Sequence, residues 1–176
     1  MGLFSRKPKE PAFDPAECQR IKAKLRQMFN EAVPDGDTYR LIEGYSTTDK
    51  TQKGIYFDKH TTTFYHYIIG YREQNWNVVL VQISRDLSVH SEAIYIDMDA
   101  VVDVEYIPKT QNAALTYQKG YGSYGELLHV VDYGQKTVAG IANLNQAAER
   151  EDFLNFLEKF RATLSVRGYK LSKWVR

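Results

Sequence analysis

Residues 120–125 read GYGSYG, a G-x-G-x-x-G pattern of the kind that cradles phosphate groups in nucleotide-binding proteins. A dinucleotide fold needs a strand before these glycines and a helix after them, because the helix N-terminus receives the pyrophosphate. Here the glycines are followed by ELLHVVDY, which has the character of a strand, and the other protein-kinase motifs are absent. The pattern therefore predicts a hairpin loop in which glycine supplies positive φ angles.

The same loop has a second interpretation, as a mobile contact loop. Lys119 supplies positive charge there, and Tyr121 and Tyr124 supply aromatic faces at the open rim of the domain. On this hypothesis, a partner would lose affinity when the loop is removed.

The other candidate groups form no recognisable catalytic or metal-binding constellation. The four histidines lack zinc-site spacing and are scattered along the chain as His60, His66, His90 and His129. His66 and His129 lie within strand patterns, so we expect packed or solvated strand residues rather than ligands or bases.

The acidic run Asp97-Met98-Asp99, with Asp103 beyond it, lacks the glycine and the closing glutamate of an EF-hand loop and is interpreted as strand-edge carboxylates. There is no G-x-S-x-G motif, and the single cysteine, Cys18, has no base beside it and cannot form an internal disulfide. We therefore expect no catalytic residue, no metal and no cofactor.

Composition predicts one soluble globular domain in a reducing compartment, with the cytoplasm as the default. Of 176 residues, 43% are hydrophobic and 26% charged, and thirteen tyrosines favour half-buried strands and contact faces. The longest aliphatic run, at 78–81, is far too short to span a bilayer, and the N-terminus lacks a secretory hydrophobic core.

The net charge of +1 hides an uneven distribution. Residues 1–30 carry a net charge of +4 and residues 161–176 a net charge of +5, which leaves −8 for the middle of the chain. An acidic body argues against nucleic-acid binding, whereas the basic ends suit an acidic surface, including anionic lipid.

The N-terminal part divides into a flexible lead-in at 1–13 and a helix at 14–34. Asp14 is an N-cap acceptor, and Pro15 suits the first helical position. One apolar stripe follows at Ile21, Leu25, Met28 and Phe29. We expect the stripe to pack on the domain, and the alternative is an interfacial membrane helix.

Residues 37–168 predict a β domain that ends in one amphipathic helix, followed by a basic tail at 169–176. Short runs rich in Tyr, Val, Ile and Thr leave no room for crossover helices, so the sheet is expected to be antiparallel. The predicted strands are 39–45, 54–57, 63–71, 77–84, 93–96, 101–107, 114–119, 126–133 and 136–142. The predicted helix spans Asn145 to Arg167, with Asn143 and Gln146 in a pattern that resembles a capping box.

Three stretches resemble the pleckstrin-homology-like superfold, in its bacterial and GRAM-type members. They are VVLVQIS at 78–84, IYIDMDAVVDVEYI at 94–107, and the run from TYQKGYGSYGELL to the end of the helix, so the resemblance covers about 76–164. It implies an α+β fold: a strongly bent antiparallel sheet, barrel or sandwich, capped by a C-terminal helix, with the N-terminal helix added. Lipid-binding members carry a basic K-x(n)-[KR]-x-R pattern at the first hairpin, and this chain has Lys50 and Lys53 there without the arginine.

These observations predict a non-enzymatic binding or adaptor module that binds a protein partner or an acidic membrane surface. The expected rim contacts are Lys50, Lys53, Lys119, Tyr121 and Tyr124. The alternative is a helix-grip protein, possibly an enzyme, that holds a small molecule in a cavity between sheet and helix. The two hypotheses differ in what lies between the sheet and the C-terminal helix. In a binding module this space is filled by side chains, which are Phe153, Phe156, Leu157 and Phe160, whereas a helix-grip protein has a cavity there.

Overall fold

The computed structural model describes residues 13–54, 57–110, 112–119, 122–134 and 139–166. These residues form an α+β fold, as the sequence predicts, with two α-helices and seven strands in place of the nine predicted. The elements, in chain order, are α1 (Pro15–Ala32), the short 3-10 helix η1 (Gly36–Thr38), β1 (Arg40–Gln52), β2 (Lys59–Arg72), β3 (Asn77–Ile83), β4 (His90–Ile96), β5 (Val101–Ile107), β6 (Asn112–Lys119), β7 (Gly122–His129) and α2 (Ala147–Val166).

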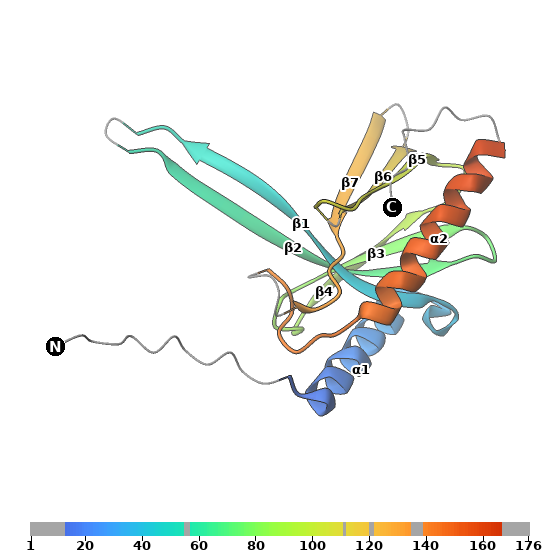
Figure 1. Cartoon of the computed structure of the whole chain (residues 1–176), viewed down its shortest axis with the longest axis horizontal. Helices are drawn as coiled ribbons and strands as arrows, with labels where there is room; N and C mark the ends of the chain where they lie inside the picture. The colour runs from blue at the N-terminus through green and yellow to red at the C-terminus, as the bar shows by residue number, and fades with distance from the viewer. Residues whose placement is uncertain (1–12, 55–56, 111, 120–121, 135–138, 167–176) are drawn as a thin grey trace.

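The seven strands form one antiparallel sheet in the order β4-β3-β2-β1-β7-β6-β5. The sheet has two meandering halves, which meet where Tyr45 of β1 pairs with His129 of β7. Among the described residues, this is the only β-ladder pair that joins the two halves, and the halves point in different directions away from it (Figure 1). The sheet is not closed, so β4 and β5 are its two edge strands.

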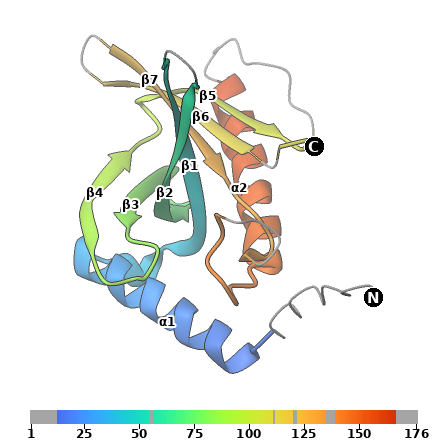
Figure 2. The same ribbon diagram turned by 90° about the vertical axis from the view of Figure 1, so that its left-hand side faces the viewer.

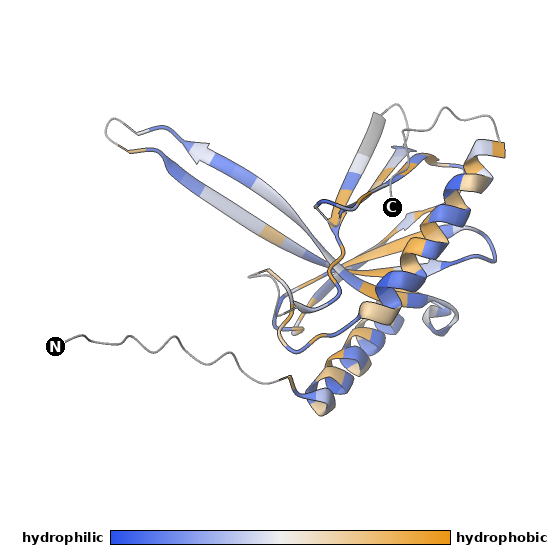
Figure 3. Cartoon of the chain, viewed as in Figure 1, coloured by the Kyte–Doolittle hydropathy of each residue, from blue (hydrophilic) through white to orange (hydrophobic). Residues whose placement is uncertain are grey.

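Helix α2 covers one face of the sheet and fills the space beneath itself. Its phenylalanines Phe153, Phe156 and Phe160 are fully buried against strand residues such as Tyr71 and Leu80. In Figure 3, hydrophobic residues gather on the body strands and on the helix sides that face them. Burial of this aromatic face is the main stabilising contribution of α2.

Helix α1 packs on the opposite face of the sheet, so the half that contains β1–β4 lies between two helices (Figure 2). The predicted N-terminal helix is confirmed and ends at Ala32, two residues before the predicted end at 34. The Asp14 side chain accepts hydrogen bonds from the backbone N–H groups of Ala16 and Glu17. The expected packing of the apolar stripe is also confirmed, because Met28 and Phe29 are buried against the sheet.

Three sequence predictions about strands are wrong. Gly54 and Phe57, the described ends of the strand predicted at 54–57, are not in a strand, and the strand predicted to reach Tyr133 ends at His129. Residues 139–142 of the strand predicted at 136–142 form bends and a turn, and 136–138 lie outside the described residues. After β7 the backbone instead bonds to the segment before α2, through a single bridge between Tyr133 and Asn145 and a bond from the Gly134 N–H to the Leu144 carbonyl, so no further ladder forms among the described residues.

The predicted helix start is also wrong, because α2 begins at Ala147 and the Gln146 side chain does not cap it. The Gln146 amide instead donates to the backbone carbonyls of Glu43 and Val131, at 2.8 and 2.9 Å, and its oxygen accepts from the Glu43 N–H at 2.9 Å. This buried side chain therefore joins β1, the segment after β7 and the start of α2. Arg167 and the predicted tail at 169–176 lie outside the described residues.

Candidate functional site

The strands of the β1–β2 hairpin have 13 and 14 residues, against 7 or 8 in the other strands, and the distal half of the hairpin projects away from the other elements (Figure 1). All thirteen residues of β1 pair with β2, without a register shift from Arg40 opposite Tyr71 to Gln52 opposite Lys59. Every described side chain of the segments 48–54 and 57–64 is exposed. We call this distal part, 48–63, the arm.

Two large apolar side chains are exposed to solvent, one on the arm and one at its base. Phe57 is 88% exposed near the tip, and Phe64 is 42% exposed on β2. Threonines, lysines and histidines surround them, and side-chain bonds such as Thr62 Oγ1 to Asp49 Oδ1, at 2.6 Å, brace the two strands across one face. Such a ribbon buries almost no apolar surface of its own, so hydrophobic burial within one chain does not explain it.

An aromatic cluster holds the root of the arm. The Tyr45 ring stacks on His129, with centroids 4.8 Å apart and planes within 8°, and meets the edge of Phe64 at 6.0 Å. His66 lies beside Tyr45, with ring centroids 6.1 Å apart. The contacts are made where the two halves of the sheet meet, so the direction of the arm is fixed by the body.

His66 is anchored by a buried carboxylate. Its Nδ1 lies 2.8 Å from Oε1 of Glu43, and the two residues are only 3% and 1% exposed. Burial raises the pKa of the Glu43 carboxyl, and the hydrogen bond to His66 opposes that shift. Both predicted strand histidines, His66 and His129, do lie in strands, and burial lowers the pKa of His129.

Two of the predicted contact residues, Lys50 and Lys53, lie on the arm. Lys50 pairs with Thr61 near the end of the ladder, and Lys53 follows the last residue of β1. Both side chains are exposed. They share the arm with Phe57, which sequence analysis did not select.

The other predicted contact residues belong to the β6–β7 hairpin. Lys119 ends β6 and pairs with Gly122, and Tyr124 lies on β7, whereas Tyr121 lies outside the described residues. Residues 122–125 of the glycine motif thus belong to β7 and pair with β6, and the chain continues after them as a strand and not as a helix, in agreement with the hairpin interpretation. The ends of this hairpin and of the arm lie far apart in Figure 1, so the predicted contact residues do not form one surface.

A separate cleft of about 340 Å³ lies between α1, β1 and the first turns of α2. Leu25, Leu41 and Ile68 are among its apolar lining, and its charged groups come from both helices and from β1. Lys22 and Glu149 form an ion pair that joins α1 to α2 beside it. This cleft lies outside the space that the phenylalanines of α2 fill.

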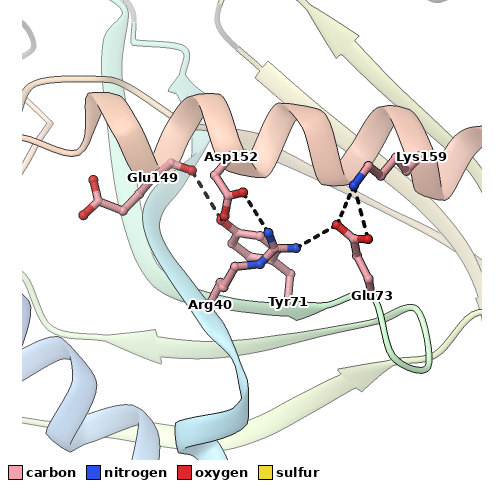
Figure 4. A network of polar contacts seen from close by, with 6 residues as sticks. All are labelled: Arg40, Tyr71, Glu73, Glu149, Asp152 and Lys159. Carbon is pink, nitrogen blue, oxygen red and sulfur yellow. Dashed lines mark hydrogen bonds and ion pairs between the residues drawn. The ribbon is translucent and has the colours of Figure 1, made fainter.

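The charged groups next to the cleft bind one another in a network (Figure 4). Arg40 donates to Asp152 at 2.7 Å and to Glu73 at 3.2 Å, and its guanidinium lies 5.0 Å from the centre of the Tyr71 ring. The Tyr71 hydroxyl donates to the second oxygen of Asp152 at 2.9 Å. Burial is the main cause that raises the pKa of Tyr71.

The network continues to Lys159, which donates to both oxygens of Glu73 and thereby lowers the pKa of that carboxyl. Its carboxylates and cations satisfy one another, which indicates that the network attaches α2 to β1 and to the end of β2. Among the described residues, no group of three His, Cys, Asp or Glu side chains is placed to hold a metal ion.

Sequence analysis missed the arm because it looked for alternation of apolar and polar residues. From Thr47 to Thr63 that alternation is absent: the described side chains are threonine, lysine and other polar residues on both faces, with Phe57 the exception. A strand pair without an apolar face has no core to pack on, and that absence was the available signal for a projecting ribbon.

No helix in the described ranges combines the length and apolar character needed to cross a membrane. No protein-family model, no curated protein and no solved structure matches this chain. The geometry of the arm and of the body therefore carries the functional argument.

Proposed function

We propose that this protein is a non-enzymatic binding module of pleckstrin-homology-like architecture that contacts a protein partner through the arm. The observation that carries the proposal is the regular, fully exposed ladder of the arm, projected from a body that is complete without it. Two paired strands without a core are marginal in water, so a contact with another molecule is the physical role that suits them.

A protein is the partner that the chemistry of the arm favours. Beyond the body, both strands present backbone N–H and C=O groups along their outer sides, and another polypeptide satisfies these groups directly. Phe57 provides an apolar anchor, and Lys50, Lys53 and Lys59 favour an acidic partner surface.

The architectural part of the proposal rests on the resemblance over 76–164 and on the order of elements. A continuous antiparallel sheet followed by one amphipathic helix is the layout of the pleckstrin-homology-like superfold, and α2 closes the body here in the same position in the chain. We also propose a cytoplasmic location, in keeping with the single buried Cys18.

The helix-grip alternative receives less support. It requires a ligand cavity between sheet and helix, and the described side chains fill that space with Phe153, Phe156, Leu157 and Phe160. The cleft of about 340 Å³ is elsewhere, and its charged rim is internally paired.

An acidic membrane is the second candidate partner, because an exposed phenylalanine among lysines suits an anionic lipid interface. Flotation with anionic and with neutral vesicles at two salt concentrations tests it. Salt-sensitive binding to anionic vesicles that is lost on substitution of both Lys50 and Lys53 by Glu would favour the membrane over the protein.

Photo-crosslinking in cells tests the main proposal. A benzophenone amino acid replaces Gln52 on the arm or, as the matched control, the exposed Glu158 on α2. We expect adducts with another protein from position 52 at several-fold higher yield than from position 158, and we expect Lys50→Glu with Lys53→Glu to reduce them. Equal yields from the two positions would contradict the proposal.

A further inference from the structure

The two ends of the sheet are protected against pairing with another strand. On β4, the step from His90 to Ala93 spans three residues against two on β3, which marks a bulge. On β5, the register shifts between Val101 and Asp103, and Arg161 donates to the backbone carbonyl of Val104. Bulges and charged side chains are the usual protection of edge strands.

The outer edge of β2 in the arm, at 59–65, has no bulge, and Lys59 at its end is the only lysine, arginine or acidic residue along it. Strand β3 pairs with β2 only from His66 to Arg72, and none of the described strands covers Lys59–Tyr65 on that side. The ladder with β1 is free of register shifts along the same residues. The segment is therefore a straight edge that is ready to accept one more strand.

A groove of about 510 Å³ lies at the corner where this edge meets the end of β3. Thr62–His66 line one side of it and Gln82–Arg85 line the other. The exposed Phe64 lies at its margin. A strand laid along β2 would end in this groove.

We propose that Lys59–Tyr65 pairs antiparallel with the same segment of a second copy of this chain, and this inference rests on the proposed role of the arm as the contact element. Centred on Thr62, the pairing places Thr61 opposite Thr63 of the second copy, and His60 opposite its Phe64. Lys59 then faces the second copy's Tyr65, so no two like charges lie opposite each other.

The same register brings complementary charges to the groove. The ladder between the two copies stops at Tyr65, because Ile83 of β3 already pairs with His66, so Asp58 of the second copy arrives beside the end of β3, which Arg85 follows. Arg85 lies close enough to the Glu43–His66 pair to act on the Glu43 carboxyl electrostatically. The second copy's Phe57, one residue further on, reaches the groove and loses its exposure to water.

Self-pairing is favoured over a foreign strand because the segment is complementary to itself. Its threonines fall at the centre, and its single lysine meets an aromatic ring and not another lysine. A two-fold axis through Thr62 repeats each favourable pair, as in an isologous dimer. The assembly joins two bodies by a ribbon of four strands.

Cysteine trapping tests the register. In antiparallel pairing, the two copies of Thr62 have Cα atoms about 5 Å apart, within the range of a disulfide. In the full-length chain, Thr62→Cys is expected to form a disulfide-linked dimer under mild oxidation. The matched control is Thr48→Cys, which is also exposed but lies on β1, away from the edge of β2 that pairs with the second copy. The wild type carries only the buried Cys18.

Charge exchange tests the pairing without a covalent trap. A chain with Thr61→Lys and Thr63→Lys, or one with Thr61→Asp and Thr63→Asp, opposes like charges at the centre of the seam. Sedimentation velocity is expected to find each variant monomeric alone and dimeric when the two are mixed, with unchanged circular dichroism.

Three results would overturn the inference: a monomeric wild type over the whole concentration range, equal trapping of the cysteines at 62 and 48, or charge variants that stay dimeric alone. The last result would place the dimer contact on another surface. Crosslinks from position 52 to a different protein, found with a wild type that is monomeric at every concentration, would leave the proposed function standing while self-pairing failed.

Discussion

At the scale of single residues, the body depends on close contacts between distant segments. Gly70 on β2 illustrates this, because a Cβ atom there would lie 2.1 Å from the tip of the buried Phe29 ring. Because Gly70 has no side chain, the Phe29 ring of α1 can occupy this space against β2.

Gly70→Ala is therefore expected to lower the free energy of unfolding by about 1–3 kcal/mol, since neither the ring nor the strand can move away freely. Gly125→Ala is the matched control, because a Cβ there meets nothing within 4 Å. Urea titration of both variants checks the prediction, and an equal effect at the two glycines would refute the account of α1 docking.

His129 gives a second prediction at this scale, about pH. Burial lowers its pKa in the folded state from 6.5, so the unfolded chain takes up the proton first as the pH falls. Stability should therefore decrease between 6.5 and the lowered pKa, and His129→Gln should lose this part of the pH dependence. Thermal melts of both proteins from pH 8 to pH 5 measure it; parallel curves would be incompatible with a half-buried ring that is neutral in the folded state.

At the scale of elements, α1 and α2 were predictable because each carries its own apolar stripe, and α1 also has a side-chain cap. Met28 and Phe29 fall where the helical period requires. The role of Gln146 was not predictable, because two of its three side-chain hydrogen bonds are made to Glu43, 103 residues earlier in the chain. Local sequence carries no information about such a partner.

The arm, too, could be predicted only in part from the local sequence. Its strands were placed approximately, but their length was underestimated because Thr48–Gln52 lack the alternation that burial imposes on body strands. The candidate site was therefore half predicted: Lys50 and Lys53 lie on the arm, whereas Phe57 and the straight edge of β2 emerged only from the structure.

Removal of the arm should leave the fold intact. Thr47 and Phe64 are paired, so replacement of 48–63 by Asn-Gly closes the ladder with a two-residue turn. Because the arm is exposed on both faces, the free energy of unfolding should change by less than about 1 kcal/mol. Urea unfolding measures this, and a loss of several kcal/mol would mean that the arm belongs to the folding core.

At the scale of the whole molecule, a body with its own hydrophobic cores orients the arm, which is the proposed contact element. Half of the sheet lies between α1 and α2, and the network around Arg40 attaches α2 to the strands beneath it (Figure 4). The root of the arm lies where the two halves of the sheet meet, and Tyr45 is central to that root. The body thus determines the direction of the arm, and the arm is free to bind.

Hydrogen exchange of the full chain at low and high protein concentration tests this account most directly, because it reports protection along each strand edge. The account predicts that, on concentration, amide exchange slows in Lys59–Tyr65 and stays unchanged in the edge strands β4 and β5. Slowing confined to β4 or β5, or no concentration dependence within the arm, would contradict it.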